Sequence, residues 1–230
     1  FMAASDAFDV RLFGRGAHGT RPETGVDPVV LAASVVMRLQ TVVAREVAAT
    51  EQAVLTVGAL HVGTMANIIA DHADLKLSVR TFDKAVGSRV LTSVRRIIDA
   101  ECAASGSPKP AEYVELFGFT PTVNDEAATE RVAGALRAQL GADAVTEIAP
   151  IMGSEDFGEF GEASGAPYVF WALGGADPEA HAAAAAAGTL EDDIPSNHSP
   201  LFAPVVQPTL TTGVTALVAA ATEWLGGHRG

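Results

Sequence analysis

DLKLSVRTF, residues 74–82, is the stretch that decides the fold, because apolar and polar side chains alternate along it without a break. The apolar side chains share one face and the polar ones share the other: Leu75, Leu77 and Val79 against Lys76, Ser78 and Arg80. A period of two is typical of a strand with one face buried and one face in solvent. The stretch therefore predicts a sheet covered on one side, with Arg80 on the uncovered side.

The segments around this strand complete a βαββαβ order. Three further segments read as strands: residues 8–13 (FDVRLF), 53–62 (AVLTVGALHV) and 111–117 (AEYVELF). One amphipathic helix begins at Asp27-Pro28, an N-cap followed by a proline at the first helical position, and another runs through Val86 and Ile97. This order predicts an α/β (α+β) protein with a ferredoxin-like domain, in which two helices cover one face of a four-stranded antiparallel sheet.

The pattern changes after Pro121. Residues 125–140 predict a helix, and residues 146–150 a short strand. The continuous apolar run at 166–175 (APYVFWALGG) is typical of a strand buried on both faces. A long closing helix is also expected, marked by Leu210, Val214, Leu217 and Ala221. We therefore expect two parts, residues 8–117 and residues 118–230, the second being a portion of a larger α/β domain.

Composition excludes several classes of function. The chain has 230 residues, 48% of them hydrophobic, and a formal net charge of -13, which disfavours nucleic acid and anionic membranes as partners. Its one cysteine, Cys102, excludes an internal disulfide framework and a cysteine-rich zinc site. Neither a signal peptide nor an unbroken apolar run of ~18 residues is apparent. We expect a cytoplasmic protein without a membrane partner.

One histidine stands out in the second part. His198 lies among turn-forming residues in IPSNHSPL (194–201), between a predicted buried strand and a helix, where α/β proteins often place their sites. Imidazole is a common ligand of transition metals, but a zinc site needs three or four ligands. From the residues alone, His198 is either a metal ligand or a loop histidine bonded to its neighbours.

Five polar residues elsewhere have both a functional and a structural interpretation. His18 lies in the glycine-rich turn GRGAHGTRP, where it is either a ligand-facing residue or a turn histidine. Asn67 can orient a substrate carbonyl or cap a turn, and Arg80 can bind a carboxylate or form a surface ion pair. Glu155, together with its neighbour Asp156 in MGSEDF, is an acid–base candidate or a charge that favours a helix N-terminus.

Taken together and in order, these motifs make the sequence resemble a known family. They are GRGAHGTRPETGVDPVVLAASVVMRLQTVVARE, VGALHVGTMANIIADHADLKLSVRTFD, PTVNDE, MGSEDF and NHSP. The chain resembles the aminoacylase, hippurate hydrolase and indole-acetyl-amino-acid hydrolase group of dinuclear metallopeptidases, which are kin of carboxypeptidase G. The resemblance implies that residues 8–117 are a lid that also forms a homodimer, and that residues 118–230 are the C-terminal part of the catalytic domain.

The resemblance also implies a role for each motif in the hydrolysis of an N-acyl amino acid. His198 would be the last ligand of a centre of two divalent metal ions (Zn, Mn, Co or Ni), which activates a water molecule. His18 would stabilise the oxyanion, in the partner subunit's site. The remaining residues would bind substrate or line the pocket: Asn67 and Arg80 at the carbonyl and carboxylate, and Gly153, Ser154 and Glu155 around them.

The sequence departs from the family pattern in one respect. The Cys-x-His or His-x-Asp motif, the Glu-Glu pair and the further histidine of the first half of the catalytic domain do not occur in it. We therefore expect this chain alone to retain no metal and to be inactive. Two alternatives are a non-catalytic dimerisation or binding module, and a dipeptidase or deacylase of the same clan.

Overall fold

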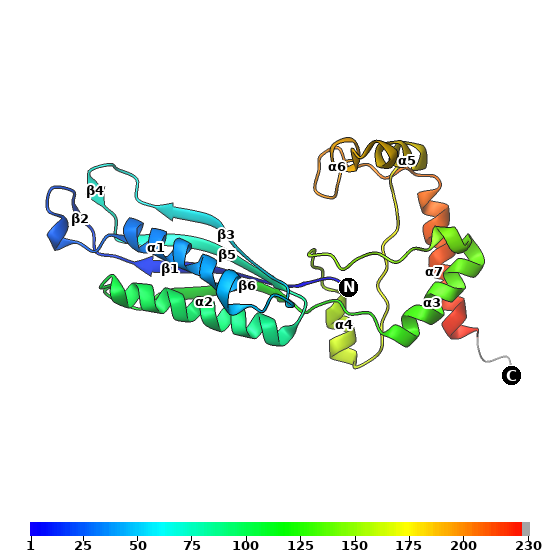
Figure 1. Ribbon diagram of the computed structural model, residues 1–230, viewed down its shortest axis with the longest axis horizontal. Helices are drawn as coiled ribbons and strands as arrows, with labels where there is room; N and C mark the ends of the chain where they lie inside the picture. The colour runs from blue at the N-terminus through cyan, green and yellow to red at the C-terminus, as the bar shows by residue number, and fades with distance from the viewer. Residues whose placement is uncertain (227–230) are drawn as a thin grey trace. The chain divides into compact units, whose positions relative to one another are not determined.

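The computed structural model describes residues 1–226, and these residues divide into two compact units. The first unit comprises Phe1–Val123 with Ala149–Ala166, and the second comprises residues 124–148 and 167–226. Figure 1 shows the elements of both units. The predicted division into a lid (8–117) and a part of the catalytic domain (118–230) stays a prediction.

The first unit contains the predicted antiparallel sheet with two helices. Its strand order is β3-β5-β1-β6, and all three neighbouring pairs are antiparallel. The strands span β1 (Ala4–Phe13), β3 (Ala53–Val62), β5 (His72–Thr81) and β6 (Glu112–Phe119). A small ladder joins β2 (Ala17–His18) and β4 (Ile68–Ile69). The βαββαβ prediction is confirmed, with strand boundaries that differ by a few residues.

Two aspartates begin the helices that cover the sheet, α1 (Pro28–Thr41) and α2 (Lys84–Ala104). The Asp27 carboxylate accepts a hydrogen bond from the Val29 N–H at 2.8 Å, with Pro28 at the first helical position, as the sequence predicts. The carboxylate of Asp83 caps α2 in the same way. A π-helical segment, η2 (Val42–Glu46), continues α1, and a 3-10 turn, η1 (Pro22–Thr24), precedes it.

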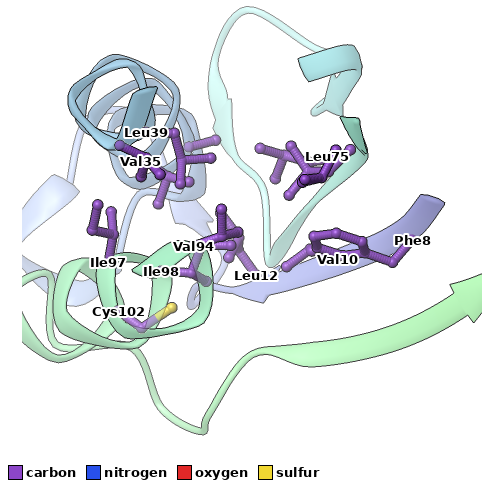
Figure 2. Packing of buried hydrophobic residues seen from close by; sticks show 14 of the residues in the cluster. Phe8, Val10, Leu12, Val35, Leu39, Leu75, Val94, Ile97, Ile98 and Cys102 are labelled. Atoms are coloured by element: carbon purple, nitrogen blue, oxygen red, sulfur yellow. The ribbon is translucent and has the colours of Figure 1, made fainter. Parts of the chain in front are cut away.

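The core lies between these helices and one face of the sheet, as Figure 2 shows. It is built from the alternate residues of β1 and β5 and the inner faces of α1 and α2: Phe8, Val10, Leu12, Leu31, Val35, Leu39, Leu75, Leu77, Val79, Val90, Val94, Ile97, Ile98 and Cys102. Because Leu75 lies on the central strand β5 and is fully buried, it contacts this core from the middle of the sheet. The prediction that Cys102 is a core residue is confirmed.

The helix over residues 28–46 is long and apolar enough to cross a membrane by length and composition. It is not an unbroken apolar run, because polar residues such as Arg38 interrupt it. Its inner face is buried against the sheet through Leu31, Ala32, Val35, Leu39 and Val42. A core helix satisfies the same criterion of length and composition, and the buried face assigns this one to the core.

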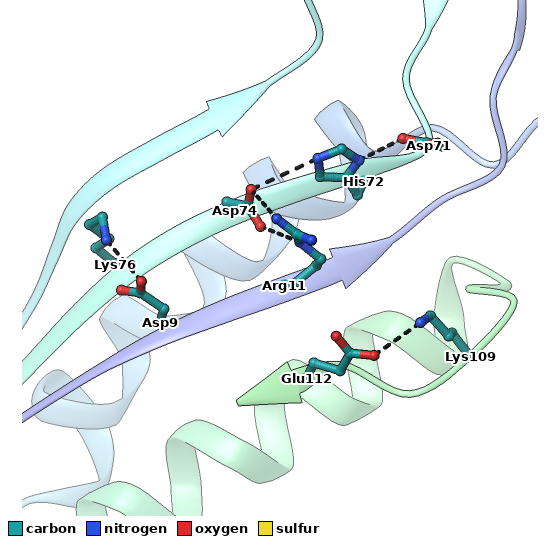
Figure 3. Close-up of polar contacts among 8 residues, drawn as sticks. All are labelled: Asp9, Arg11, Asp71, His72, Asp74, Lys76, Lys109 and Glu112. Carbon is teal, nitrogen blue, oxygen red and sulfur yellow. Dashed lines mark hydrogen bonds and ion pairs between the residues drawn. The ribbon is translucent and has the colours of Figure 1, made fainter. Parts of the chain in front are cut away.

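The face of the sheet away from the helices carries charge. Arg11 makes a bidentate contact with Asp74, with Nε 2.7 Å from Oδ1, and Lys76 lies 2.8 Å from Asp9 (Figure 3). The hydrogen bond from Arg11 holds the pKa of Asp74 below its usual value. Exposed pairs of this kind contribute about 0–1 kcal/mol each, so the opposite, apolar face provides most of the stability.

The second unit contains helices and no strand within residues 124–148 and 167–226. Its elements are α3 (Glu126–Leu140), η3 (Ala142–Ala144), α5 (Pro178–Ala187), α6 (Leu190–Asp193) and α7 (Thr209–Leu225). The predicted helix at 125–140 is confirmed. The predicted strands at 146–150 and 166–175 are wrong, because no neighbouring strand is present among the described residues of this unit to accept their backbone hydrogen bonds.

The predicted closing helix α7 is confirmed, and the face that it buries is made of small residues. The small residues Ala216, Ala219 and Ala220 pack against α3, beside Val132 and Leu136. The large apolar side chains that mark this helix in the sequence are 61–63% exposed: Leu210, Val214 and Leu217. Small residues let two helices approach closely, and nothing in the described part of the second unit covers the larger ones.

We predict that Leu75→Ala lowers the free energy of unfolding of the first unit by about 2–5 kcal/mol, because it leaves a cavity in a packed core. The measurement is the reaction rate of the Cys102 thiol during a urea titration. This single cysteine is buried, and burial raises the pKa of its thiol, so its labelling reports opening of this unit.

The matched control is Lys76→Ala, one residue along the same strand on the exposed face, which should cost less than about 1 kcal/mol. Equal losses for the two variants would contradict the assignment of the core to the helix-covered face.

Candidate functional site

The glycine-rich turn of the sequence forms a tightly fixed loop at the end of β1. Gly14 lies where a Cβ atom would be 2.4 Å from the Val26 carbonyl oxygen, so a larger residue cannot replace it without a backbone shift. Arg15 and Val26 exchange backbone hydrogen bonds of 2.9 and 3.0 Å across the base of the loop. The loop is therefore held at its base by backbone contacts that require glycine.

The structure brings His18 and Asn67, which lie far apart in the sequence, to the same place. His18 pairs with Ile68 in the β2–β4 ladder, and the Gly19 N–H donates to the Asn67 carbonyl oxygen at 2.8 Å. Both side chains are exposed. Two groups that sequence analysis assigned to substrate carbonyl chemistry therefore share one surface of the first unit.

Thr20 determines the orientation of the His18 ring and was not identified from the sequence. Its hydroxyl lies 2.8 Å from His18 Nδ1, and its backbone N–H donates to the same nitrogen at 3.2 Å. The signal available in the sequence was a threonine two residues after a histidine. At this spacing, within a turn, the threonine hydroxyl and amide can both reach the histidine ring.

Arg80 lies on the face of β5 away from the helices, where the alternation placed it. Its Nη1 donates to the Met152 carbonyl oxygen at 2.7 Å and approaches the Ser154 hydroxyl at 3.4 Å. The structure therefore joins the predicted residues Arg80 and Ser154. Arg80 is half-buried, and its remaining N–H groups make no hydrogen bond to a side chain or carbonyl within residues 1–226.

Gly153 and Glu155 have structural partners in the first unit. The Gly153 carbonyl accepts a hydrogen bond from the Ala3 N–H at 3.0 Å. The Glu155 carboxylate accepts one from the Thr122 hydroxyl and one, at 2.9 Å, from the Phe157 N–H at the start of α4 (Phe157–Ser164). Thr122 is fully buried. Glu155 thus places its charge at the N-terminus of α4, just before the N-cap residue Asp156, and its role at a substrate stays a prediction.

His198 belongs to the second unit, where it occupies an exposed turn. Its φ of 71° places it in the left-handed region, which histidine enters more readily than most residues. The neighbouring Ser199 N–H donates to the Ser196 carbonyl oxygen at 3.1 Å and closes the turn. The backbone therefore presents the imidazole outward and explains why turn formers surround it.

The described residues do not fit the two-metal centre that the resemblance implies. Within residues 1–226, no three His, Cys, Asp or Glu side chains group in a way that could hold a metal ion. Metal sites with histidine take three or four protein ligands. His198 as a ligand therefore stays a prediction that concerns a longer protein.

Comparison with known proteins connects this geometry to a family. Residues 5–105 match the peptidase dimerisation domain of the M20 type. N-acetyl-L-cysteine deacetylase from Bacillus subtilis is 34% identical over 175 residues, which cover 76% of this chain and 41% of the relative. Hippurate hydrolase from Campylobacter jejuni is 32% identical over 171 residues, covering 74% of this chain and 44% of the relative.

Thermostable carboxypeptidase 1 from Saccharolobus solfataricus is 28% identical over 169 residues, covering 74% of this chain and 42% of the relative. The chain thus spans less than half the length of these relatives. Among solved structures, aminopeptidase PepT from Bacillus cereus has a TM-score of 0.68 at 18% identity, covering 98% of this chain and 52% of that one. The fold of the first unit, the domain match and these relatives agree, and the chain belongs to the M20 family of peptidases and amidohydrolases.

Proposed function

We propose that the chain is the lid and C-terminal catalytic segment of a metal-dependent amidohydrolase that cleaves the amide bond of N-acyl amino acids. The observation that carries the proposal is Arg80. Its guanidinium is half-buried and anchored through one nitrogen to the Met152 carbonyl, which leaves the other donors for a substrate carboxylate. A cytoplasmic location is part of this proposal.

The surface formed by His18 and Asn67 at the β2–β4 ladder supports the same chemistry. When a nucleophile attacks an amide carbonyl, negative charge develops on the carbonyl oxygen, and hydrogen-bond donors that face it lower the barrier. An exposed imidazole and an exposed carboxamide on two segments joined by the β2–β4 ladder are suitable donors. Arg80 would bind the free carboxylate of an N-acyl amino acid, and His18 and Asn67 would bind its amide carbonyl. Arg80 pairs with Ser5 at one end of the β1–β5 ladder and the loop of His18 follows Phe13 at the other end, so one substrate would meet both only from different copies of the chain.

The names of relatives favour this substrate class. N-acetylcysteine and hippurate, named in two relatives at 32–34% identity, are both N-acyl amino acids. A further relative, an IAA-amino acid hydrolase from Arabidopsis thaliana, is 32% identical over 167 residues.

The sheet edge at β3 supports a homodimer. The ten residues of β3 (AVLTVGALHV) include no Asp, Glu, Lys or Arg, whereas β6 at the other edge carries Glu112 and Glu115. Long edge strands without charges pair readily with a second strand. We propose that two copies join through β3, in agreement with the dimerisation domain that residues 5–105 match.

We predict that the purified 230-residue chain, dialysed after incubation with Zn²⁺, Mn²⁺, Co²⁺ or Ni²⁺, retains less than about 0.1 metal ion per chain, because three or four protein ligands are needed. Elemental mass spectrometry measures this, and a hippurate assay should show no turnover. One or two ions per chain, lost in His198→Ala, would contradict the prediction.

We predict that, in a chain extended upstream to the length of its relatives, Arg80→Gln raises KM for hippurate by about 10- to 150-fold, since a charged hydrogen bond contributes about 1.5–3 kcal/mol. The control substrate is hippuramide, which lacks the carboxylate. Its KM should therefore be nearly the same for the Arg80→Gln variant and the wild-type enzyme. A similar loss with both substrates would indicate a purely structural role for Arg80. If the extended chain hydrolyses neither substrate, the proposed function is wrong.

We predict that Thr56→Lys, on β3, converts the dimer into a monomer, because antiparallel pairing of two edges brings the new charges close together. Sedimentation velocity at micromolar concentration measures this. Thr146→Lys, which adds the same charge at an exposed position of the second unit, should leave the dimer intact. A wild-type chain that sediments as a monomer would exclude the interface.

A further inference from the structure

We propose that Thr20 is a positioning residue that holds the neutral ring of His18 in the Nε2–H tautomer, so that the outward nitrogen is a hydrogen-bond donor. The inference rests on the proposed function in one respect, because that function assigns His18 to a developing oxyanion. The tautomer itself follows from the contacts of the loop.

The backbone around His18 is fixed on both sides of the ring. The Arg21 N–H donates to the His18 carbonyl oxygen at 2.8 Å and closes a turn over Gly19 and Thr20. Gly19 in turn donates to Asn67, and a Cβ atom at Gly19 would lie 3.0 Å from that same carbonyl oxygen. Thr20 is therefore placed by main-chain contacts, independently of its own hydroxyl.

The two contacts to Nδ1 decide where the ring proton lies. A hydroxyl can donate or accept, so the 2.8 Å contact from Thr20 Oγ1 is compatible with either tautomer. A backbone N–H can only donate, and the Thr20 amide points at Nδ1 from 3.2 Å. Nδ1 must therefore accept from both groups, so the Thr20 hydroxyl donates as well, and a neutral imidazole whose Nδ1 accepts carries its proton on Nε2.

This arrangement matters because the two tautomers present opposite groups to a substrate. With the proton on Nε2, His18 offers an N–H to an oxygen that gains negative charge. With the proton on Nδ1, it would offer a lone pair that repels the same oxygen. No side chain or carbonyl within residues 1–226 bonds to Nε2, so this nitrogen is open to a ligand.

The loop provides a matched control at Thr24. The Thr24 hydroxyl donates to the Arg21 carbonyl oxygen at 2.8 Å, in the same loop and at the same distance, but it does not contact His18. Thr24→Val and Thr20→Val therefore remove the same group from the same loop. Thr20→Ser keeps both the hydroxyl and the amide.

The first experiment needs no catalysis. Imidazole ¹⁵N shifts of the ¹⁵N-histidine-labelled 230-residue chain are recorded at pH about 8.5, where histidine is ordinarily neutral, and His18 is assigned with His18→Gln. We expect the Nε2–H tautomer in wild type, Thr20→Ser and Thr24→Val, and a shift towards a mixture in Thr20→Val alone. An Nδ1–H ring in wild type would overturn the inference, and shifts in Thr20→Val identical to those of wild type would overturn the contribution of the Thr20 hydroxyl and leave the amide as the group that holds the tautomer.

The second experiment measures the consequence in the extended enzyme. Removal of an oxyanion donor lowers kcat by about 10²- to 10³-fold, which we expect for His18→Ala. Because the amide remains, Thr20→Val should lower kcat by a smaller factor, about 3- to 30-fold, with KM unchanged. Thr20→Ser should restore kcat, and Thr24→Val should not change it; equal effects of the two valine variants would overturn the positioning role.

The two experiments separate this inference from the proposed function. A locked Nε2–H tautomer in an extended chain that does not hydrolyse N-acyl amino acids would overturn the function and leave the tautomer established. Hydrolysis by an enzyme whose His18 carries its proton on Nδ1 would support the function and overturn the inference.

Discussion

The packing of α1 and α2 against one face of the four-stranded sheet is the interaction on which the rest of the first unit depends. Leu75 on β5 and Val10 on β1 are fully buried beneath these helices, and they fix the register of the two central strands. A shift of one residue would move every apolar side chain to the charged face. The register also determines where the strands end, and the loop of His18 begins at one of those ends.

The same alternation that builds the core also supplies the polar groups of the candidate site. Arg80 lies one residue after the buried Val79, so its side chain emerges on the open face, where the Met152 carbonyl meets it. An arginine anchored at one nitrogen loses less freedom when it binds a second partner. The sheet therefore positions a cation that would be mobile on a loop.

Local sequence patterns predicted the first unit well, because both its strands and its helices bury one face and expose the other. The period-two alternation around Leu75 and the Asp-Pro pair at Asp27 each have one structural solution. The run at 166–175 has more than one, because a continuous apolar segment is compatible both with a buried strand and with extended chain beside helices. The family resemblance named His18, Asn67, Arg80 and Ser154 as site residues, and these roles stay predictions; the Thr20 contact depends on loop geometry that no spacing rule specifies.

The outer face of α7 has a consequence for the behaviour of the chain in a cell. Leu210, Val214, Leu217 and Val218 present side chains that are 58–63% exposed along one helix. Chaperones and proteases recognise exposed apolar surfaces of this kind. Chains with such a surface also tend to aggregate at micromolar concentration. The yield and lifetime of the protein in solution therefore depend more on how many of these leucines and valines are buried against a partner than on the well-packed sheet domain.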